Sequence, residues 1–277
     1  MQPKVSAGGR PAFGEPSNRN NFVSAVVPVY NEQKTVAKVV RTLLKSPRIA
    51  EVIVVNDGST DNSRAILRKF GDRIRFLDFR RNRGKGFALA IGIKKAHGEI
   101  VTFWDADLLN LSEKHIQSLT EPILSKEAEI VLGHRALSPF KNITGQRAYY
   151  RRDLLPHLGR MAKTRFGVEV YLNDALKDLK LVQIPWRDLE TLLKYQKFDS
   201  KTALQEYLKA GTEIAQTITR REITKLNQDW KVLKKVSKIK SLTELRKTAE
   251  EIESPQIRKI LNDYVLKYIA PKTSRKR

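Results

Sequence analysis

The sequence EIVTFWDAD, from Glu99 to Asp107, decides the fold because it has the form of a buried strand that ends in two carboxylates. Its apolar run from Ile100 to Trp104 is rich in β-branched and aromatic residues, which favours a strand. Ligands of open parallel α/β sheets bind at the carboxyl ends of the strands, where Asp105 and Asp107 stand. Two carboxylates one residue apart can both reach a divalent cation such as Mg²⁺. The alternative is that they cap the next helix or form a turn.

Strands and helices alternate through the first half of the chain, with short links between them. The predicted strands occupy residues 22–29, 51–56, 74–79, 100–104 and 129–132. The predicted helices occupy residues 35–44, about 61–70, 87–96 and 113–124. This alternation predicts an α/β fold in which a mostly parallel sheet is flanked by helices on both faces.

Three of the predicted strands end in polar clusters, which are Tyr30-Asn31-Glu32, Asn56-Asp57-Gly58 and Asp105-Ala106-Asp107. Because parallel strands share one direction, the three clusters are expected to line the same edge of the sheet. The sequence therefore predicts one site assembled from three loops. The alternative is three unrelated turns at strand ends.

A basic loop, residues 80–86, follows the third predicted strand. Its four cationic side chains fall within six positions and are accompanied by two glycines: Arg80, Arg81, Arg83, Gly84, Lys85 and Gly86. A diphosphate requires this kind of charge compensation, and the N-terminus of the helix that follows favours anions. Lys85 is the strongest single candidate in the loop. The alternative is a basic loop that is simply solvated.

Composition limits the class of protein. The 277 residues suffice for one large domain or for a domain with an appendage. The absence of Cys and the presence of only four His argue against thiolate chemistry and a zinc site, and fit a cytoplasmic enzyme. The net charge of +23 attracts polyanions, which include nucleic acids, anionic lipids and phosphorylated substrates. No apolar run approaches the ~20 residues that a membrane span needs.

The sequence divides into four parts by composition. Residues 1–21 are rich in Gly, Pro, Ser and Asn and are predicted to be a disordered arm without a signal peptide. Residues 22–187 form the α/β domain, residues 188–270 a basic helical appendage, and residues 271–277 a basic tail. From residue 188 onward there are 21 Lys and Arg against 12 Asp and Glu. The appendage is expected to contact an anionic membrane surface peripherally, or else to pack on the domain or mediate oligomerisation.

Four motifs occur in order and with compatible spacing. They are VPVYNE (27–32), VVNDGSTD (54–61), RNRGKG (81–86) and WDAD (104–107). Together they resemble the nucleotide-sugar-binding half of family 2 glycosyltransferases, which have the GT-A (Rossmann-like) fold, over about residues 22–185. The stretches GQRAYYRR (145–152) and FGVEV (166–170) extend the resemblance to the dolichyl-phosphate mannose and glucose synthases and related lipid-linked sugar transferases.

This resemblance implies a metal-dependent, inverting hexosyltransferase that uses a UDP- or GDP-linked sugar. Asp57 would accept a hydrogen bond from the base, and Asp105 and Asp107 would hold Mg²⁺ or Mn²⁺, with Asp107 the more direct ligand. The residues implied to bind the nucleotide sugar are Pro28, Tyr30, Glu32, Asp57, Gly58, Lys85, Asp105 and Ala106.

The resemblance also implies that the acceptor is a polyprenyl phosphate. Arg135, Arg147 and Arg151 would grip its phosphate, and Arg147, Asp107 and Glu169 are the predicted catalytic residues. Glu169 is either a sugar-binding or general-base carboxylate or a paired structural residue. A phosphate monoester is largely ionised at neutral pH, so such an acceptor needs no dedicated base.

Three rival functions remain open at the level of sequence. The acceptor could be the hydroxyl group of a soluble sugar or a protein. The high charge also suggests a nucleic-acid-binding protein, but basic residues interleaved with stacking aromatics are not found. The third rival is a GT-A domain that serves as a scaffold without catalysis. The sequence favours the enzyme, cytoplasmic or peripheral at the cytoplasmic face of a membrane, and leaves its oligomeric state open.

Overall fold

The computed structural model describes residues 22–136 and 141–192, together with isolated positions at 213, 247, 250, 251, 255 and 258. The predicted arm over residues 1–21 therefore lies outside the described residues. The same holds for the basic tail and for the helices predicted between residues 193 and 270, apart from those isolated positions.

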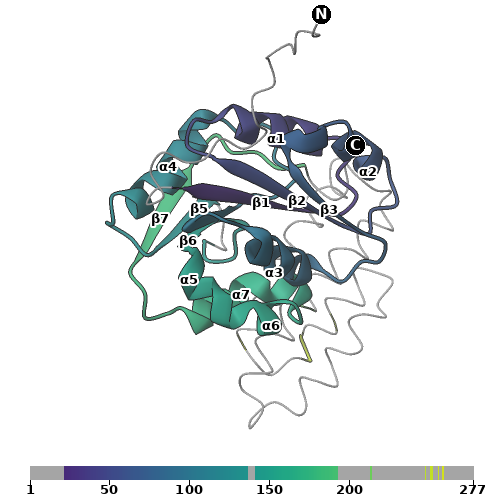
Figure 1. Cartoon of the computed structure of the whole chain (residues 1–277). Coiled ribbons are helices and arrows are strands. Elements are labelled where there is room, and N and C mark those ends of the chain that lie inside the picture. The colour runs from purple at the N-terminus through teal and green to yellow at the C-terminus, as the bar shows by residue number, and fades with distance from the viewer. Residues whose placement is uncertain are drawn as a thin grey trace, which may run out of the picture.

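A seven-stranded sheet forms the centre of the molecule (Figure 1). Its strands are β1 (Val23–Val29), β2 (Glu51–Asp57), β3 (Arg75–Phe79), β4 (Ile100–Phe103), β5 (Ile130–Arg135), β6 (Gln146–Tyr150) and β7 (Leu181–Trp186). The spatial order is β3-β2-β1-β4-β6-β5-β7. β6 is antiparallel to both of its neighbours, and every other pairing is parallel. The sheet is thus mostly parallel, as predicted.

Helices cover both faces of the sheet (Figure 1). One face carries α1 (Val36–Lys45), α2 (Ser63–Arg68) and α4 (Glu113–Leu124). The other carries α3 (Lys85–Lys95), α5 (Arg151–Leu154), α6 (Leu158–Met161) and α7 (Val168–Ala175). Short 3₁₀ turns lie at Gly71–Arg73, Leu155–His157 and Arg165–Gly167. None of the helices in the described part of the chain has the length and apolar character needed to cross a membrane.

Side-chain alternation along the central strands builds two hydrophobic cores, one on each face of the sheet. In β2, Val52 and Val54 pack into the core beneath α1 and α4, whereas Ile53 and Val55 pack into the core beneath α3. Successive side chains of a strand point to opposite faces, so a continuous apolar run satisfies both cores. This is why the central strands β1, β2 and β4 are buried and mostly apolar up to their carboxyl ends.

The predicted strands and helices up to residue 132 all form, with boundary shifts of a few residues. The segment from β6 to β7, with three short helices between them, was not assigned from the sequence. The sequence also predicts that the helical appendage begins with a helix over residues 188–195, and residues 188–192, its described part, form no helix. Glu190 accepts a backbone hydrogen bond from Leu109, and Leu192 donates one to Asp107 (2.9 and 2.8 Å). These bonds to the loop after β4 replace the bonds that a helix would have made.

We expect the core beneath α4 to be sensitive to truncation. Leu119→Ala removes a side chain that is completely buried against the sheet, and it should lower the free energy of unfolding by about 2–5 kcal/mol. Leu155→Ala is the matched control, because that side chain is 40% exposed, and it should cost no more than about 0.5 kcal/mol. Urea denaturation measures both values. Equal losses in the two variants would contradict the assigned packing.

Candidate active site at the carboxyl edge of the sheet

The loops that follow β1 and β2 are tied together by hydrogen bonds at the carboxyl edge of the sheet. Asn31 adopts a left-handed backbone conformation and donates its N–H to Ser59 Oγ (3.0 Å), while its side-chain oxygen accepts the N–H of Thr60 (2.8 Å). The N–H of Glu32 is held by Ser63 Oγ (2.8 Å). The two predicted clusters are therefore one structural unit.

A cavity of about 180 Å³ opens beside this unit. It is lined by the two loops and by one residue from beyond β7: Asn31, Glu32, Gln33, Lys34, Thr60, Asp61 and Leu192. Leu192 also donates its N–H to the carbonyl of Asp107, so the third predicted cluster adjoins the cavity. Of the residues predicted to wall the base and ribose, Glu32 lines this cavity, whereas Pro28 and Tyr30 are half-buried and lie outside its lining.

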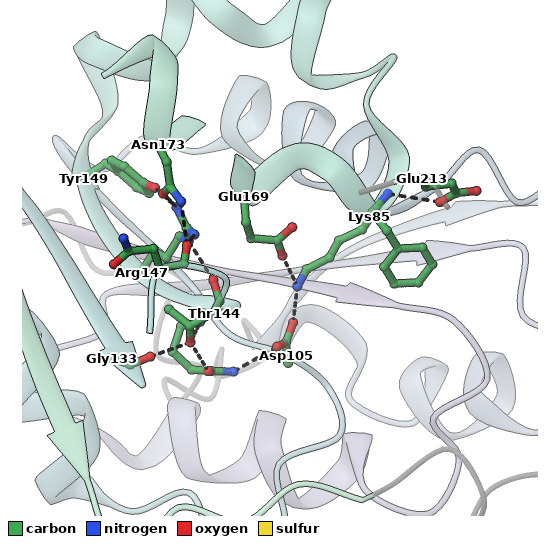
Figure 2. A network of polar contacts seen from close by, with 12 residues as sticks. Lys85, Asp105, Gly133, Thr144, Arg147, Tyr149, Glu169, Asn173 and Glu213 are labelled. Carbon is green, nitrogen blue, oxygen red and sulfur yellow. Dashed lines mark hydrogen bonds and ion pairs between the residues drawn. The ribbon is translucent and has the colours of Figure 1, made fainter. Parts of the chain in front are cut away.

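A buried ion-pair cluster joins three of the predicted site residues (Figure 2). Lys85, at the start of α3, places its Nζ 2.7 Å from Asp105 Oδ1 and 2.6 Å from Glu169 Oε1, which comes from α7. Only 14% of the Lys85 side chain is exposed. Asp105 Oδ2 accepts a further hydrogen bond from the amide of Gln146 (3.0 Å). Residues far apart in the sequence thus meet through one ammonium group.

The charge of Lys85 is fixed by its surroundings. Burial by itself would lower the pKa of Lys85, but the negative charges of Asp105 and Glu169 and their hydrogen bonds outweigh it, and the pKa is raised above its ordinary value. Lys85 therefore remains an ammonium ion at any physiological pH. It can compensate an anion but cannot serve as a base.

Asp57 holds the basic loop against the end of β2. It is 2% exposed, and its carboxylate accepts hydrogen bonds from the N–H groups of Arg83 (2.9 and 3.1 Å) and Gly84 (2.6 Å). Burial raises the pKa of Asp57, while these N–H groups and the charges of Arg165 and Arg83 oppose the rise. The sequence predicts that Asp57 binds the base; the structure shows in addition that it positions the loop.

Two glycines allow the chain to pack closely around this loop. Gly58 has φ +75°, and a Cβ there would lie 2.6 Å from the backbone of Arg81 and Asn82. Gly84 has φ +100°, and a Cβ there would lie within 3 Å of Arg165. The resemblance implies that Gly58 contacts the nucleotide sugar. In the structure, other parts of the chain occupy the space beside both glycines, and only a residue without a side chain fits such positions.

The carboxylates of Asp105 and Asp107 suit a hard cation. Among the described residues, no group of three or more His, Cys, Asp or Glu side chains is arranged to hold a metal ion. Mg²⁺ nonetheless commonly takes one or two protein carboxylates and completes its shell with substrate phosphates and water. Both oxygens of Asp105 already contact protein groups, and Oδ1 of Asp107 is buried. Ala106 between them is buried in the core and contributes no ligand.

Arg147 is 1% exposed and is held within the protein (Figure 2). Its guanidinium donates to four acceptors at 2.6–2.9 Å: the carbonyls of Asn142 and Thr144, the hydroxyl of Tyr149 and the side-chain oxygen of Asn173. The sequence analysis assigns this residue to the acceptor phosphate. In the structure Arg147 instead ties the loop before β6 to α7, and its donors are directed at protein acceptors.

The other two predicted acceptor residues lie at opposite edges of the sheet. Arg135 is exposed at the carboxyl end of β5, on the edge that carries Asp105. Arg151 lies past the end of the antiparallel β6, where it bonds to the carbonyls of Glu99 (2.7 Å) and Ile93 (3.2 Å). The structure therefore does not bring Arg151 together with the predicted site.

Some residues of the site were not identified from the sequence. Gln146, which contacts Asp105, lies within the motif 145–152. The motif could therefore have identified it as a site residue. Asn173 and Arg165 have no motif of their own. Arg165 contacts the basic loop across more than eighty positions, at Asn82 Oδ1 (3.0 Å) and the Arg83 carbonyl (3.3 Å). Only the fold brings these residues into contact.

We expect Lys85→Met to leave two carboxylates without their shared counter-ion. The variant should lose about 3 kcal/mol of unfolding free energy, because an uncompensated buried charge is costly. Lys95→Met is the matched control, since that side chain is exposed at the other end of α3, and it should stay within about 0.5 kcal/mol of the wild type. Denaturant unfolding at pH 7 compares them. A wild-type stability for Lys85→Met would exclude the ion-pair cluster.

A structural role for Arg147 has its own test. Arg147→Met removes donors from four buried or half-buried acceptors, and we expect a loss of about 2–4 kcal/mol. Arg135→Met makes the same change at an exposed position of the neighbouring strand and should cost about 0.5 kcal/mol or less. If thermal and urea unfolding show the two variants to be equally stable, Arg147 does not anchor the loop.

Comparison with known proteins identifies the family. The family model described as glycosyl transferase family 2 matches residues 24–172, which is more than half of the chain. A dolichyl-phosphate β-glucosyltransferase of Trichomonas vaginalis is 38% identical over 133 residues, covering 42% of this chain and 39% of that protein. A dodecaprenyl-phosphate galacturonate synthase of Rhizobium johnstonii is 32% identical over 121 residues, covering 41% and 36%. The matched stretch thus spans well under half of these curated relatives.

Solved structures agree on the fold. Glucosyl-3-phosphoglycerate synthase of Mycobacterium tuberculosis, in complex with phosphoglyceric acid, matches with a TM-score of 0.55 at 21% identity. The match covers 73% of this chain and 80% of that chain. The predicted resemblance is confirmed: the chain belongs to glycosyl transferase family 2, and its mostly parallel sheet has the GT-A arrangement.

Proposed function

We propose that this glycosyltransferase transfers a hexose from a UDP- or GDP-linked sugar to a polyprenyl phosphate, with inversion and with Mg²⁺ or Mn²⁺. The observation that carries the donor half is the meeting of Lys85, Asp105 and Glu169 at the carboxyl edge, beside the basic loop and the cavity next to β1 and β2. An ammonium ion at a helix N-terminus and a pair of carboxylates are the groups that a metal-bound diphosphate requires.

The nucleotide end of the donor would lie against the loops after β1 and β2. Asn31, Ser59 and Thr60 hold these two loops together, so the surface offered to a base and ribose is preorganised. The predicted base and ribose contacts come from the carboxyl ends of β1 and β2 and from the loops that follow them: Pro28, Tyr30, Glu32, Asp57 and Gly58. The proposal keeps Asp57 as a base contact, with the additional role of positioning the basic loop.

The diphosphate would lie between the basic loop and the end of β4. Asp105 and Asp107 would hold the metal ion, which when bound would neutralise charge on the leaving nucleoside diphosphate. Lys85 would supply a permanent positive charge beside the same phosphates. Because Lys85 contacts Asp105 Oδ1, metal binding by both carboxylates requires this ion pair to loosen. Structures of the M. tuberculosis synthase with Mn²⁺ and UDP-glucose support metal use in this fold.

The transfer itself would be a single displacement. An oxygen of the acceptor phosphate bonds to the anomeric carbon as the bond from that carbon to the diphosphate oxygen breaks, and the nucleoside diphosphate leaves with the electron pair. An ionised phosphate has no proton to lose at that oxygen, so no base is needed. Glu169 is accordingly proposed to orient Lys85 through their 2.6 Å contact rather than to remove a proton.

The acceptor half rests on different observations. The curated relatives include proteins named for dolichyl-phosphate and dodecaprenyl-phosphate. Of the three predicted acceptor arginines, Arg135 is exposed on the edge that carries Asp105, so we propose it for the acceptor phosphate. The net charge of +23 supports peripheral contact with an anionic membrane at its cytoplasmic face. A soluble hydroxyl acceptor is the alternative.

A panel of donors tests the donor half. We expect one of UDP-glucose, UDP-galactose, UDP-glucuronate or GDP-mannose to raise the melting temperature only when Mn²⁺ or Mg²⁺ is present. Saturation at about 100 times Kd corresponds to about 2.7 kcal/mol. Asp107→Asn should abolish the metal-dependent part, whereas Asp72→Asn, at an exposed position, should retain it. No shift with any donor would refute the proposal.

Transfer assays with the donor so identified test the acceptor half. We expect sugar transfer to undecaprenyl phosphate and none to undecaprenol, because the phosphate is the nucleophile. Arg135→Met should raise the KM for the lipid phosphate without changing the Kd of the donor. Transfer to the alcohol or to a soluble sugar, but not to the phosphate, would overturn the polyprenyl phosphate assignment while leaving the donor half intact.

A further inference from the structure

Arg165 and Asp57 both hold the basic loop. The Arg165 guanidinium lies 3.0 Å from Asn82 Oδ1 and 3.3 Å from the Arg83 carbonyl. Asp57 accepts the N–H groups of Arg83 and Gly84. The carboxylate of Asp57 therefore binds donors of the loop, and the guanidinium of Arg165 binds acceptors of the same loop.

Holding Arg165 in this place has a conformational cost. Arg165 has φ +50°, a left-handed conformation that is uncommon for a residue with a side chain. It packs against the Cα of Gly84, and its charge stands next to a loop that already carries four cations. An arrangement of this kind persists only where a further group fixes it.

That further group is Glu213. Its Oε1 accepts a hydrogen bond from Arg165 Nε (2.7 Å), and its Oε2 accepts the N–H of Phe166 (3.2 Å). The Glu213 side chain is 12% exposed and that of Arg165 is 36% exposed, so the carboxylate is the more shielded partner of the pair. One carboxylate thus fixes both the side chain of Arg165 and the backbone just before α7, the helix that carries Glu169.

We infer that Glu213 is a positioning residue for donor binding, which acts through Arg165 on the basic loop and through Phe166 on the start of α7. Both members of the Lys85–Glu169 ion pair are affected, because the loop leads into Lys85 and α7 carries Glu169. The part of the chain beyond β7 consequently helps to build the donor site. The assignment of the basic loop to a donor rests on the proposed function, but the mechanical link from Glu213 to the loop does not.

Amide hydrogen exchange tests the link without any ligand. In the full-length protein, Glu213→Gln removes the charge that holds Arg165 while nearly preserving size. We expect the amides of Arg83 and Gly84 to exchange about 10-fold faster, in line with the loss of one charge-assisted hydrogen bond. Glu250→Gln, at an exposed position in the same part of the chain, should leave them unchanged. Unchanged exchange in Glu213→Gln would overturn the inference.

A double-mutant cycle and a binding measurement complete the test. In an Arg165→Met background, Glu213→Gln should have little further effect on loop exchange, because the two residues act as one unit; full additivity would contradict the pathway through Arg165. With UDP and Mn²⁺ as the probe, Glu213→Gln should weaken binding by about 10-fold, whereas Glu250→Gln should leave the affinity unchanged. Faster exchange with unaltered UDP affinity would show that Glu213 only stabilises the fold. If the wild type binds no nucleotide, the proposed function fails, and the exchange data still decide the link.

Discussion

The ion pairs of Lys85 with Asp105 and Glu169 are the interaction on which the rest of the site depends. They connect the first residue of α3, the end of β4 and the first turn of α7, three places that no local sequence signal relates to one another. A buried ammonium ion is tolerated because two carboxylates surround it, and removal of Lys85 would leave both carboxylates without their shared counter-ion. The position of the basic loop and the orientation of Asp105 are therefore set together.

Much of the polar structure at the carboxyl edge serves to place loops. Asp57 holds the backbone of Arg83 and Gly84, and Arg147 gathers the loop before β6. Both residues were first assigned to ligands on the basis of their motifs. Their contacts show that some of the motif residues in this chain hold loops in place.

The fold could be predicted well where the hydrophobic pattern is unambiguous. β1, β2 and β4 are buried on both faces, so their apolar runs and the polar residues that end them can be recognised from the sequence alone. β6 (QRAYY) could not be recognised, because its polar residues are buried through partners such as Thr144 and Asn173 that the pattern does not reveal. The helix predicted after residue 187 does not form over its described part for a related reason: the backbone groups of Glu190 and Leu192 pair with the loop after β4, and the sequence pattern does not reveal such partners.

The sequence by itself determined the class of fold, the edge at which the site lies, and the identity of Asp105, Asp107, Asp57 and Lys85 as its polar residues, because strand periodicity and motif order are local properties. Only the tertiary structure decided which of them contact one another. In the tertiary structure Lys85 pairs with Glu169, and Arg147 is buried. Arg151 lies at the opposite edge of the sheet. Arg165, which contacts the basic loop, is bonded to Glu213. These contacts join residues dozens of positions apart, and side-chain partnership over such separations is fixed by packing rather than by sequence pattern.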